Sequence, residues 1–254
     1  MDRALYISMT GAKHNMLAQA AHSHNLANAS TTGFKAEFVE AVSQFVNQGD
    51  GYKTRAYAVT QTPRTNLAKG SLQETGRDLD VAVDGEGWIA IVNGAGEEAY
   101  TRAGKLATDV FGVLRNEHGD QVWGNGGPIV IPEAEKIEIG GDGTISVRTL
   151  GQGPQTLVEI DRIKLVNPDL NQLEKRADGK IYAKDENGNG ELATLPPDAS
   201  VRLRKGFVEN SNVNTVEELT NVVSLARQFE LQVKMMQTVA EMAESQSRLL
   251  QVQV

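Results

Sequence analysis

The residues of this sequence that could carry out chemistry do not form an arrangement that a common cofactor requires. Residues 85–90 match the G-x-G-x-x-A pattern of a dinucleotide-binding loop. Such a loop opens a helix, whereas residues 88–92 alternate like a strand, so we interpret the match as a turn. Asp78, Asp80 and Asp84 suggest a calcium site, but no D-x-D-x-D-G loop with a closing Glu is present. We therefore predict capped turns at these positions.

The side chains that usually serve as catalysts also lack the spacing that catalysis needs. His22 and His24 are two residues apart on a probable helix, which points them to different faces, and the H-E-x-x-H spacing is missing. The chain has no cysteine, no G-x-S-x-G elbow and no phosphate-binding loop. Nothing singles out a catalytic pair among the 33 acidic residues. We expect no enzymatic activity, no cofactor and no metal.

Charge and hydropathy limit the partners of the chain. A formal net charge of −8 over 254 residues repels nucleic acids and anionic membranes, and no basic stripe interleaved with aromatic residues overrides that repulsion. Residues 1–3 lead directly into an amphipathic segment without the apolar region of a secretory signal, and no window approaches the roughly 20 apolar residues of a membrane helix. We expect no nucleic-acid partner, no cleaved signal peptide and no membrane insertion.

Glycine and proline divide the chain into helical ends and a β-rich middle. Residues 1–48 contain two glycines and residues 207–254 none, whereas the other 23 glycines and all seven prolines lie between. The middle combines turn dipeptides with short alternating apolar runs, which is typical of antiparallel strands. The predicted fold class is α+β, with long N- and C-terminal α-helices forming a coiled-coil domain (1–35 and 210–254) and a central, mainly antiparallel all-β domain (76–209). Residues 36–75 are predicted to be an extended connector with weak strands.

The C-terminal helix carries the clearest periodicity in the sequence. Its apolar residues follow an unbroken 3,4 spacing, which indicates the a and d positions of a coiled coil. Nine of the ten positions are apolar, and the ten are Leu219, Val222, Ala226, Phe229, Val233, Met236, Ala240, Ala243, Ser247 and Leu250. A weaker repeat near the N-terminus comprises Leu5, Met9, Ala12, Met16, Gln19, Ser23 and Leu26. Thr215 and Glu218 predict a capping box at the start of the C-terminal helix, and Gly33 is predicted to adopt a left-handed conformation just after the N-terminal helix.

These two helices bury too little apolar surface to be stable as an isolated pair. About a dozen seam side chains contribute roughly 1.5–3 kcal/mol each, whereas ordering a residue costs roughly 1–2 kcal/mol and some 65 residues must be ordered. We therefore predict that the terminal helices are labile in the free chain. Helices of other subunits are expected to cover the rest of their apolar arc.

Two polar segments at the helix junctions differ from ordinary turns. Residues 25–35 and 209–214 place short amide and hydroxyl side chains next to the helix ends, including Asn25, Asn28, Asn210, Asn212 and Asn214. One or two such residues are explained by caps and turns, but five asparagines at both junctions are not. We expect amide pairs between neighbouring chains to fix the register of an assembly.

The same segments resemble the terminal signatures of the bacterial flagellar rod and hook protein family. Residues 25–35 are similar to the N-terminal signature, and residues 209–214 with 217–219 are similar to the C-terminal one. Residues 80–88 and 142–146 look like the β domain that rod and hook members share. The resemblance covers nearly the whole chain.

The resemblance implies a structural subunit of the basal-body rod that polymerises through its terminal helices and transmits torque. It implies export through the flagellar type III apparatus without a cleaved signal, a periplasmic location, and other rod subunits and copies of itself as partners. Residues 1–6, the Gly87-Trp88 pair and residues 227–234 look most like the proximal rod type. A distal rod or hook role is the alternative within the family. A secreted β-rich carbohydrate-active protein or adhesin with a coiled-coil tail is the alternative outside it.

The candidate assembly residues combine the helix seams with the junction side chains. They are Leu5, Met9, Asn25, Leu26, Asn28, Gly33, Phe34, Asn210, Asn212, Asn214, Leu219, Val222, Phe229, Val233, Met236 and Leu250.

Overall fold

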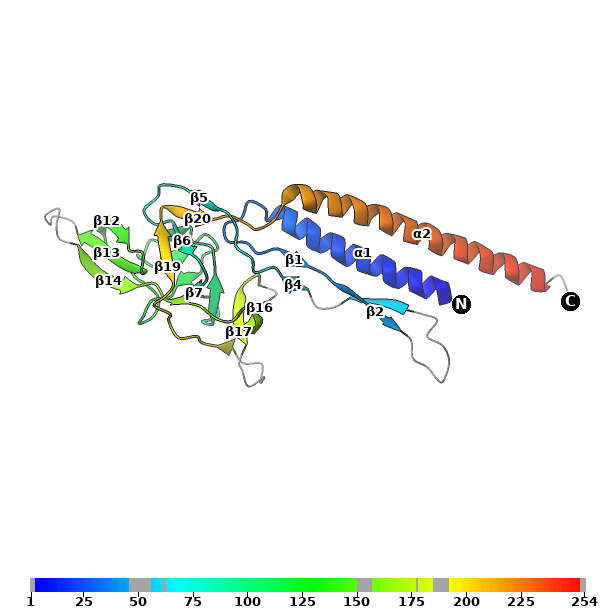
Figure 1. The fold of residues 1–254 in the computed structure, drawn as a ribbon, viewed down its shortest axis with the longest axis horizontal. Helices are drawn as coiled ribbons and strands as arrows, with labels where there is room; N and C mark the ends of the chain where they lie inside the picture. The colour runs from blue at the N-terminus through cyan, green and yellow to red at the C-terminus, as the bar shows by residue number, and fades with distance from the viewer. Residues whose placement is uncertain are drawn as a thin grey trace. The chain divides into compact units, whose positions relative to one another are not determined.

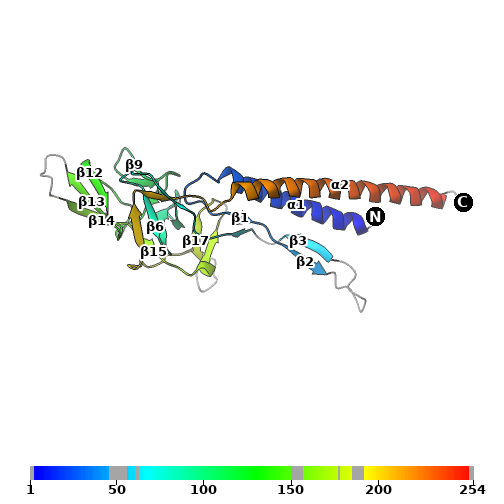
Figure 2. The same cartoon turned by 45° about the horizontal axis from the view of Figure 1, so that its top comes forward.

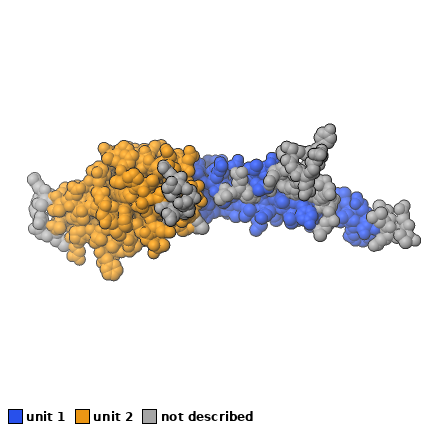
Figure 3. Space-filling view, turned by 90° about the horizontal axis from the view of Figure 1, so that it is seen from below, with its two compact units in different colours: residues 1–29, 36–66, 213–254 blue, residues 30–35, 67–212 orange. Residues whose placement is uncertain are grey.

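A computed structural model describes residues 3–45, 56–60, 63–149, 157–176, 178–184 and 192–251. The chain is α+β, with a helix toward each end and a β-rich region between them, as the sequence predicts (Figure 1). It divides into two compact units, which Figure 3 colours separately. Unit 1 comprises residues 1–29, 36–66 and 213–254, and unit 2 comprises residues 30–35 and 67–212. Residues 36–75, predicted to be a connector, are thus shared between the two units.

Unit 1 is built on two helices that lie side by side (Figures 1 and 2). Helix α1 spans Arg3–Ala27 and helix α2 spans Thr215–Gln251. The end of α1 contacts the start of α2, so the helices run antiparallel. Four short strands complete the described part of the unit: β1 (Glu37–Phe38) pairs with β4 (Arg64–Thr65), and β2 (Ala41–Phe45) pairs with β3 (Ala56–Thr60). Strand β3 packs against α1.

Unit 2 is antiparallel throughout its described strands. Its main sheet has the order β16-β17-β8-β7-β11-β10-β9, with β15 paired to β7 and β18 paired to β17. These strands are β7 (Trp88–Val92), β8 (Glu98–Thr101), β9 (Leu106–Thr108), β10 (Leu114–Asn116), β11 (Gln121–Val122), β15 (Leu165–Val166), β16 (Leu173–Lys175), β17 (Ile181–Lys184) and β18 (Leu192–Ala193). A second sheet has the order β12 (Ala134–Ile139), β13 (Thr144–Thr149), β14 (Val158–Arg162). Two further pairs join β6 (Val81–Asp84) to β19 (Arg202–Lys205) and β5 (Leu72–Glu74) to β20 (Phe207–Glu209). A short 3-10 helix spans Leu170–Gln172.

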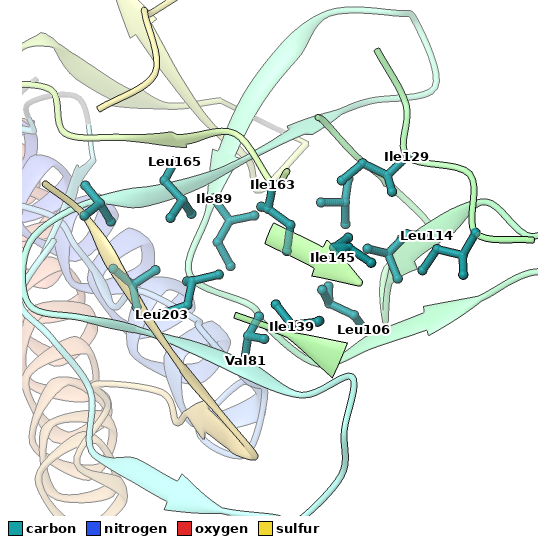
Figure 4. Packing of buried hydrophobic residues seen from close by; sticks show 14 of the residues in the cluster. Val81, Ile89, Leu106, Leu114, Ile129, Ile139, Ile145, Ile163, Leu165 and Leu203 are labelled. Carbon is teal, nitrogen blue, oxygen red and sulfur yellow. The ribbon is translucent and has the colours of Figure 1, made fainter. Parts of the chain in front are cut away.

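The core of unit 2 is aliphatic and joins the two sheets. Strands of both sheets and of the β6–β19 pair contribute side chains to it, together with residues from the segments between strands (Figure 4). The buried cluster comprises Val81, Val83, Ile89, Leu106, Leu114, Val122, Ile129, Ile131, Ile139, Ile145, Val147, Ile163, Leu165, Val201 and Leu203. Strand β7 is buried on both faces, because Ile89 belongs to this cluster whereas Trp88 and Ala90 belong to a second one.

Gly33 adopts the conformation that the sequence predicts for it. Its φ angle is +66°, in the left-handed region. A Cβ atom at this position would collide with the backbone of Ala103, and the Gly33 N–H donates a hydrogen bond of 2.7 Å to the Glu209 carbonyl. Glycine is thus required because the N-terminal segment passes in direct backbone contact with the β region of the same unit.

Candidate functional site: helix faces and terminal junctions

Small and polar residues of α1 face α2. Ser8, Ala12, Asn15 and Ala18 are buried, and the Ser8 hydroxyl donates to the Met235 Sδ at 3.1 Å. The sequence repeat places Met9 rather than Ser8 in the seam, and Met9 is exposed instead. The reason is steric, because small side chains allow two helices to approach more closely than methionines do.

The inner face of α2 follows the predicted seam only in part. Val222, Phe229, Val233 and Met236 are half-buried, in agreement with the repeat. Leu219 is exposed. Val239, the buried residue nearest the C-terminal end of the described part of α2, lies beside the predicted stripe. The predicted stripe is therefore rotated relative to the face that α1 covers. The side chain of Leu250 lies outside the described residues.

The rotation of both helices leaves large apolar side chains on their outer faces. We call these side chains the outer helix surface. It comprises Tyr6, Ile7, Met9, Met16 and Leu17 of α1 and Val216, Leu219, Val223, Leu231 and Met242 of α2. Single exposed apolar residues are common on soluble proteins, but a set this large on two adjacent helices is typical of a surface that another protein covers.

Asn25 connects the end of α1 to the start of α2. Its side-chain amide donates to the Glu37 carbonyl at 2.7 Å and to Glu218 Oε1 at 3.0 Å, and its Oδ1 accepts the Glu37 N–H at 2.8 Å. The other Glu218 oxygen is hydrogen-bonded to the His22 Nδ1. The Asn28 amide donates to the His24 carbonyl at 2.9 Å. These amides form hydrogen bonds inside one chain, whereas the sequence analysis expected them to pair between chains.

Asn214, not Thr215, caps helix α2. Its Oδ1 accepts the N–H groups of Val216 and Glu217 at 3.2 and 3.4 Å, and Thr215 is already the first helical residue. The predicted capping box of Thr215 and Glu218 is therefore wrong. Asn and Thr are both good N-caps. The helix begins at Thr215, so Asn214 occupies the capping position, and the Glu218 carboxylate accepts a hydrogen bond from Asn25 of α1.

The remaining junction residues lie in unit 2, next to strand β20. The Asn210 N–H donates to the Ser71 carbonyl at 2.8 Å, and the Asn212 amide donates to the Ala68 carbonyl at 2.9 Å. The Asn212 N–H reaches the Phe34 carbonyl at 3.4 Å. These contacts attach the segment that leads to α2 onto the segment that follows α1.

Of the other candidate residues, Leu5 and Leu26 are half-buried on α1.

A buried ion cluster, which the sequence analysis did not predict, joins both terminal segments to the β region of unit 2. Lys35 Nζ lies 2.6 Å from Glu209 Oε1, and Arg102 Nη1 lies 3.0 Å from Glu209 Oε2. The Gly70 N–H also donates to Glu209, at 2.9 Å. Both cations lie over the Trp88 ring, 5.8 and 5.2 Å from its centre. Lys35 and Glu209 belong to the two polar segments singled out by sequence, which was the available signal.

The charges of this cluster are held by one another. Burial acts to raise the pKa of the Glu209 carboxyl, but the hydrogen bonds and charges of Lys35, Gly70 and Arg102 outweigh it, so that this pKa lies below its ordinary value. Burial lowers the pKa of Lys35, and the hydrogen bond and charge of Glu209 offset part of that effect. The cluster therefore works as a structural clamp with an ionised carboxylate.

Within the residues that the structure describes, no group of three or more His, Asp or Glu side chains could hold a metal ion. None of the described helices is long and apolar enough to cross a bilayer.

Comparison with known proteins gives the family of this chain. A model of the flagellar basal body rod FlgEFG protein C-terminal region matches residues 204–249, a model of the flagellar hook protein FlgE/F/G D1 domain matches residues 82–147, and a model of flagella basal body rod proteins matches residues 5–35. The flagellar basal-body rod protein FlgF of Salmonella typhimurium strain LT2 is 37% identical over 241 residues, which is 95% of each chain. FlgF of Escherichia coli K12 is 35% identical over 98% of this chain and 99% of its own length. FlgG of Bacillus subtilis strain 168 is 32% identical over 94% of this chain and 95% of its own length.

The helical ends, the antiparallel β region and the two terminal signatures define an axial structural protein. The chain belongs to the flagellar basal-body rod protein family, and it is similar to FlgF proteins over nearly its whole length. The family predicted from the two polar segments is thereby confirmed, and so is the role of structural rod subunit.

Proposed function

We propose that this chain is a subunit of the proximal rod that polymerises through its terminal helices into the shaft that transmits torque. The assembly domain consists of residues 1–35 and 210–254, the β domain of residues 76–209, and residues 36–75 connect them. The role is structural and involves no catalysis. The observation that carries the proposal is the outer helix surface, where large apolar side chains of α1 and α2 remain exposed within a single chain.

The outer helix surface supports a coiled-coil assembly with helices of neighbouring subunits. The inner faces are already partly filled by small and polar residues, so the apolar area available for association lies outside the helix pair. Burial of an apolar side chain stabilises by roughly 1.5–3 kcal/mol. Ten such residues therefore supply a driving force that one chain leaves unused.

The proposed partners and location follow from family membership. Other rod subunits and further copies of this chain supply the covering helices. We infer export through the flagellar type III apparatus and assembly in the periplasm, because the chain belongs to the flagellar basal-body rod protein family. The similarity to FlgF proteins favours the proximal rod over the distal rod or hook.

A pair of matched substitutions on α2 tests the proposal. Leu231 is 66% exposed and belongs to the outer helix surface, whereas Gln237 is an exposed polar residue of the same helix. Leu231→Asp is expected to abolish rod assembly and motility while the purified chain keeps its circular dichroism and unfolding temperature. Gln237→Asp introduces the same charge and is expected to leave motility intact. A motile Leu231→Asp strain would contradict the assignment of this surface.

A further inference from the structure

The sulfur of Met235 joins the two helices of unit 1. The buried Ser8 hydroxyl of α1 donates to the Met235 Sδ of α2 at 3.1 Å. Met235 is nevertheless 56% exposed, so its side chain also faces solvent. A thioether sulfur is a weak hydrogen-bond acceptor, and it is the atom of methionine that oxidants attack. A reactive atom that solvent can reach is therefore also part of the contact between α1 and α2.

The donor, and not the exposure, distinguishes Met235 from the other exposed methionines. All six methionines lie within residues 1–16 or 235–242. Met9, Met16 and Met242 are exposed to a similar extent as Met235. Among the residues that the structure describes, none donates a hydrogen bond to the sulfur of Met16 or Met242. These two methionines therefore serve as internal references for the chemistry of Met235.

We propose that Met235 is a redox modification site, which hydrogen peroxide oxidises on the solvent-facing side of its sulfur and which thereby loosens the contact between α1 and α2. The sulfur donates an electron pair to one peroxide oxygen, the O–O bond breaks, and an S–O bond forms. The departing hydroxide takes the proton of the transferred oxygen and leaves as water. The sulfur loses two electrons and the peroxide gains them, so the product is methionine sulfoxide.

Oxidation weakens the contact with Ser8 because it changes the sulfur itself. The sulfoxide sulfur carries a partial positive charge and is a poorer acceptor of the Ser8 hydroxyl than the thioether sulfur. The side chain also becomes polar where it packs against α1. This inference concerns a contact within one chain, so it does not depend on the proposed function.

The Ser8 contact also gives the reaction a handedness. A thioether sulfur has two lone pairs, and oxidation of one or the other produces opposite sulfoxide epimers. The lone pair that accepts from Ser8 is shielded by α1, which approaches α2 closely here: a Cβ atom at Gly11, one turn further along α1, would lie 3.2 Å from Gln232 Nε2. The oxidant is left with the other lone pair. One epimer should therefore predominate at Met235.

Peroxide treatment of the full-length chain tests the handedness. After proteolysis, the peptides are incubated with either of the two methionine sulfoxide reductases, each of which reduces one epimer, and are measured by mass spectrometry. One epimer is expected in about threefold excess or more at Met235 and in near-equal amounts with the other at Met16 and Met242. Ser8→Ala removes the donor and should bring the ratio at Met235 close to that of the two reference methionines.

Limited proteolysis of α1 in the full-length chain tests the loosening. Oxidation should accelerate cleavage about fivefold, which corresponds to the loss of one hydrogen bond of about 1 kcal/mol. Met235→Leu keeps an apolar side chain of similar volume that peroxide does not oxidise. Its cleavage rate should be the same before and after peroxide treatment, although the other methionines are still oxidised.

Three results would overturn the proposal. Equal amounts of both epimers at Met235 in the natural chain would show that Ser8 does not shield the sulfur. An excess that persists in Ser8→Ala would show that another group sets the handedness. Acceleration of cleavage in Met235→Leu as large as in the natural chain would assign the loosening to the other methionines.

Discussion

Replacing Glu209 by glutamine removes the charge that holds two buried cations, and the structure gives the size of the effect. Glu209 accepts hydrogen bonds from Lys35, Gly70 and Arg102, and the two charged partners are almost fully buried. Breaking a buried ion pair from one side costs about 3–5 kcal/mol, because the remaining charge stays buried without compensation. Lys35→Met leaves Glu209 paired with Arg102 and is expected to cost less, about 2–3 kcal/mol.

The assay is equilibrium unfolding of the full-length chain followed by tryptophan fluorescence. Both tryptophans, Trp88 and Trp123, belong to unit 2, so their signal reports on the unit that contains the cluster. Since about 1 kcal/mol shifts the melting temperature of a domain of this size by roughly 2–4 °C, Glu209→Gln is expected to lower it by about 6–20 °C. The Lys35→Met/Glu209→Gln double variant should lose at least about 1 kcal/mol less than the sum of the single variants, because the two residues are in contact.

Glu86 supplies the matched control. It pairs with Lys69 at 2.6 Å, but both side chains are largely exposed, so Glu86→Gln should cost no more than about 1 kcal/mol. The reasoning is refuted if Glu209→Gln and Glu86→Gln destabilise unit 2 equally. It is also refuted if the effects of Lys35→Met and Glu209→Gln simply add.

Three further predictions concern pH and the helix junctions. The pKa of Glu209 lies below its ordinary value of 4.5, so the stability that the ionised Glu209 contributes is present above pH 4.5 and is lost as the pH falls through the lowered pKa. The difference in unfolding free energy between the natural chain and Glu209→Gln should therefore shrink in acid. A constant difference from neutral pH to pH 2 would contradict this. Asn214→Ala should destabilise α2 by about 1 kcal/mol and Thr215→Ala by much less, as measured by helix content during thermal unfolding. A larger effect of Thr215→Ala would indicate that Thr215, not Asn214, caps the helix. Asn25→Ala leaves the Glu37 N–H and a Glu218 oxygen without their partner and should increase proteolysis of α1 far more than Asn28→Ala does; equal cleavage of the two variants would count against the junction.

The sequence predicts the features of this fold that depend on local patterns. The scarcity of glycine and the absence of proline near the ends predict α1 and α2, and the alternating runs predict strands such as β7 and β13. For these elements the determining interaction lies within a few residues along the chain. The left-handed conformation of Gly33 also agrees with the prediction, but α1 ends at Ala27, and the close backbone approach to Ala103 is what requires glycine at this position.

The features that the sequence analysis missed depend on distant residues. The repeat ranks Met9 as a seam residue by its apolar character, but the face of α1 that meets α2 depends on contacts with distant residues, such as that of Ser8 with Met235, which are 227 positions apart. The ion cluster unites Lys35, Arg102 and Glu209 from three separate segments, so no spacing along the chain reveals it. The family resemblance pointed to the correct segments, and only the fold shows which of their side chains meet.

The proposed function requires that a single chain leaves the outer helix surface uncovered and that neighbouring subunits cover it. Hydrogen exchange of the free chain compared with assembled rods tests this claim most directly. We predict rapid exchange in α1 and α2 of the free chain, slow exchange in the strands of unit 2 in both states, and strong protection of both helices only after assembly. Slow exchange in both helices of a chain that stays monomeric at high concentration would contradict the account.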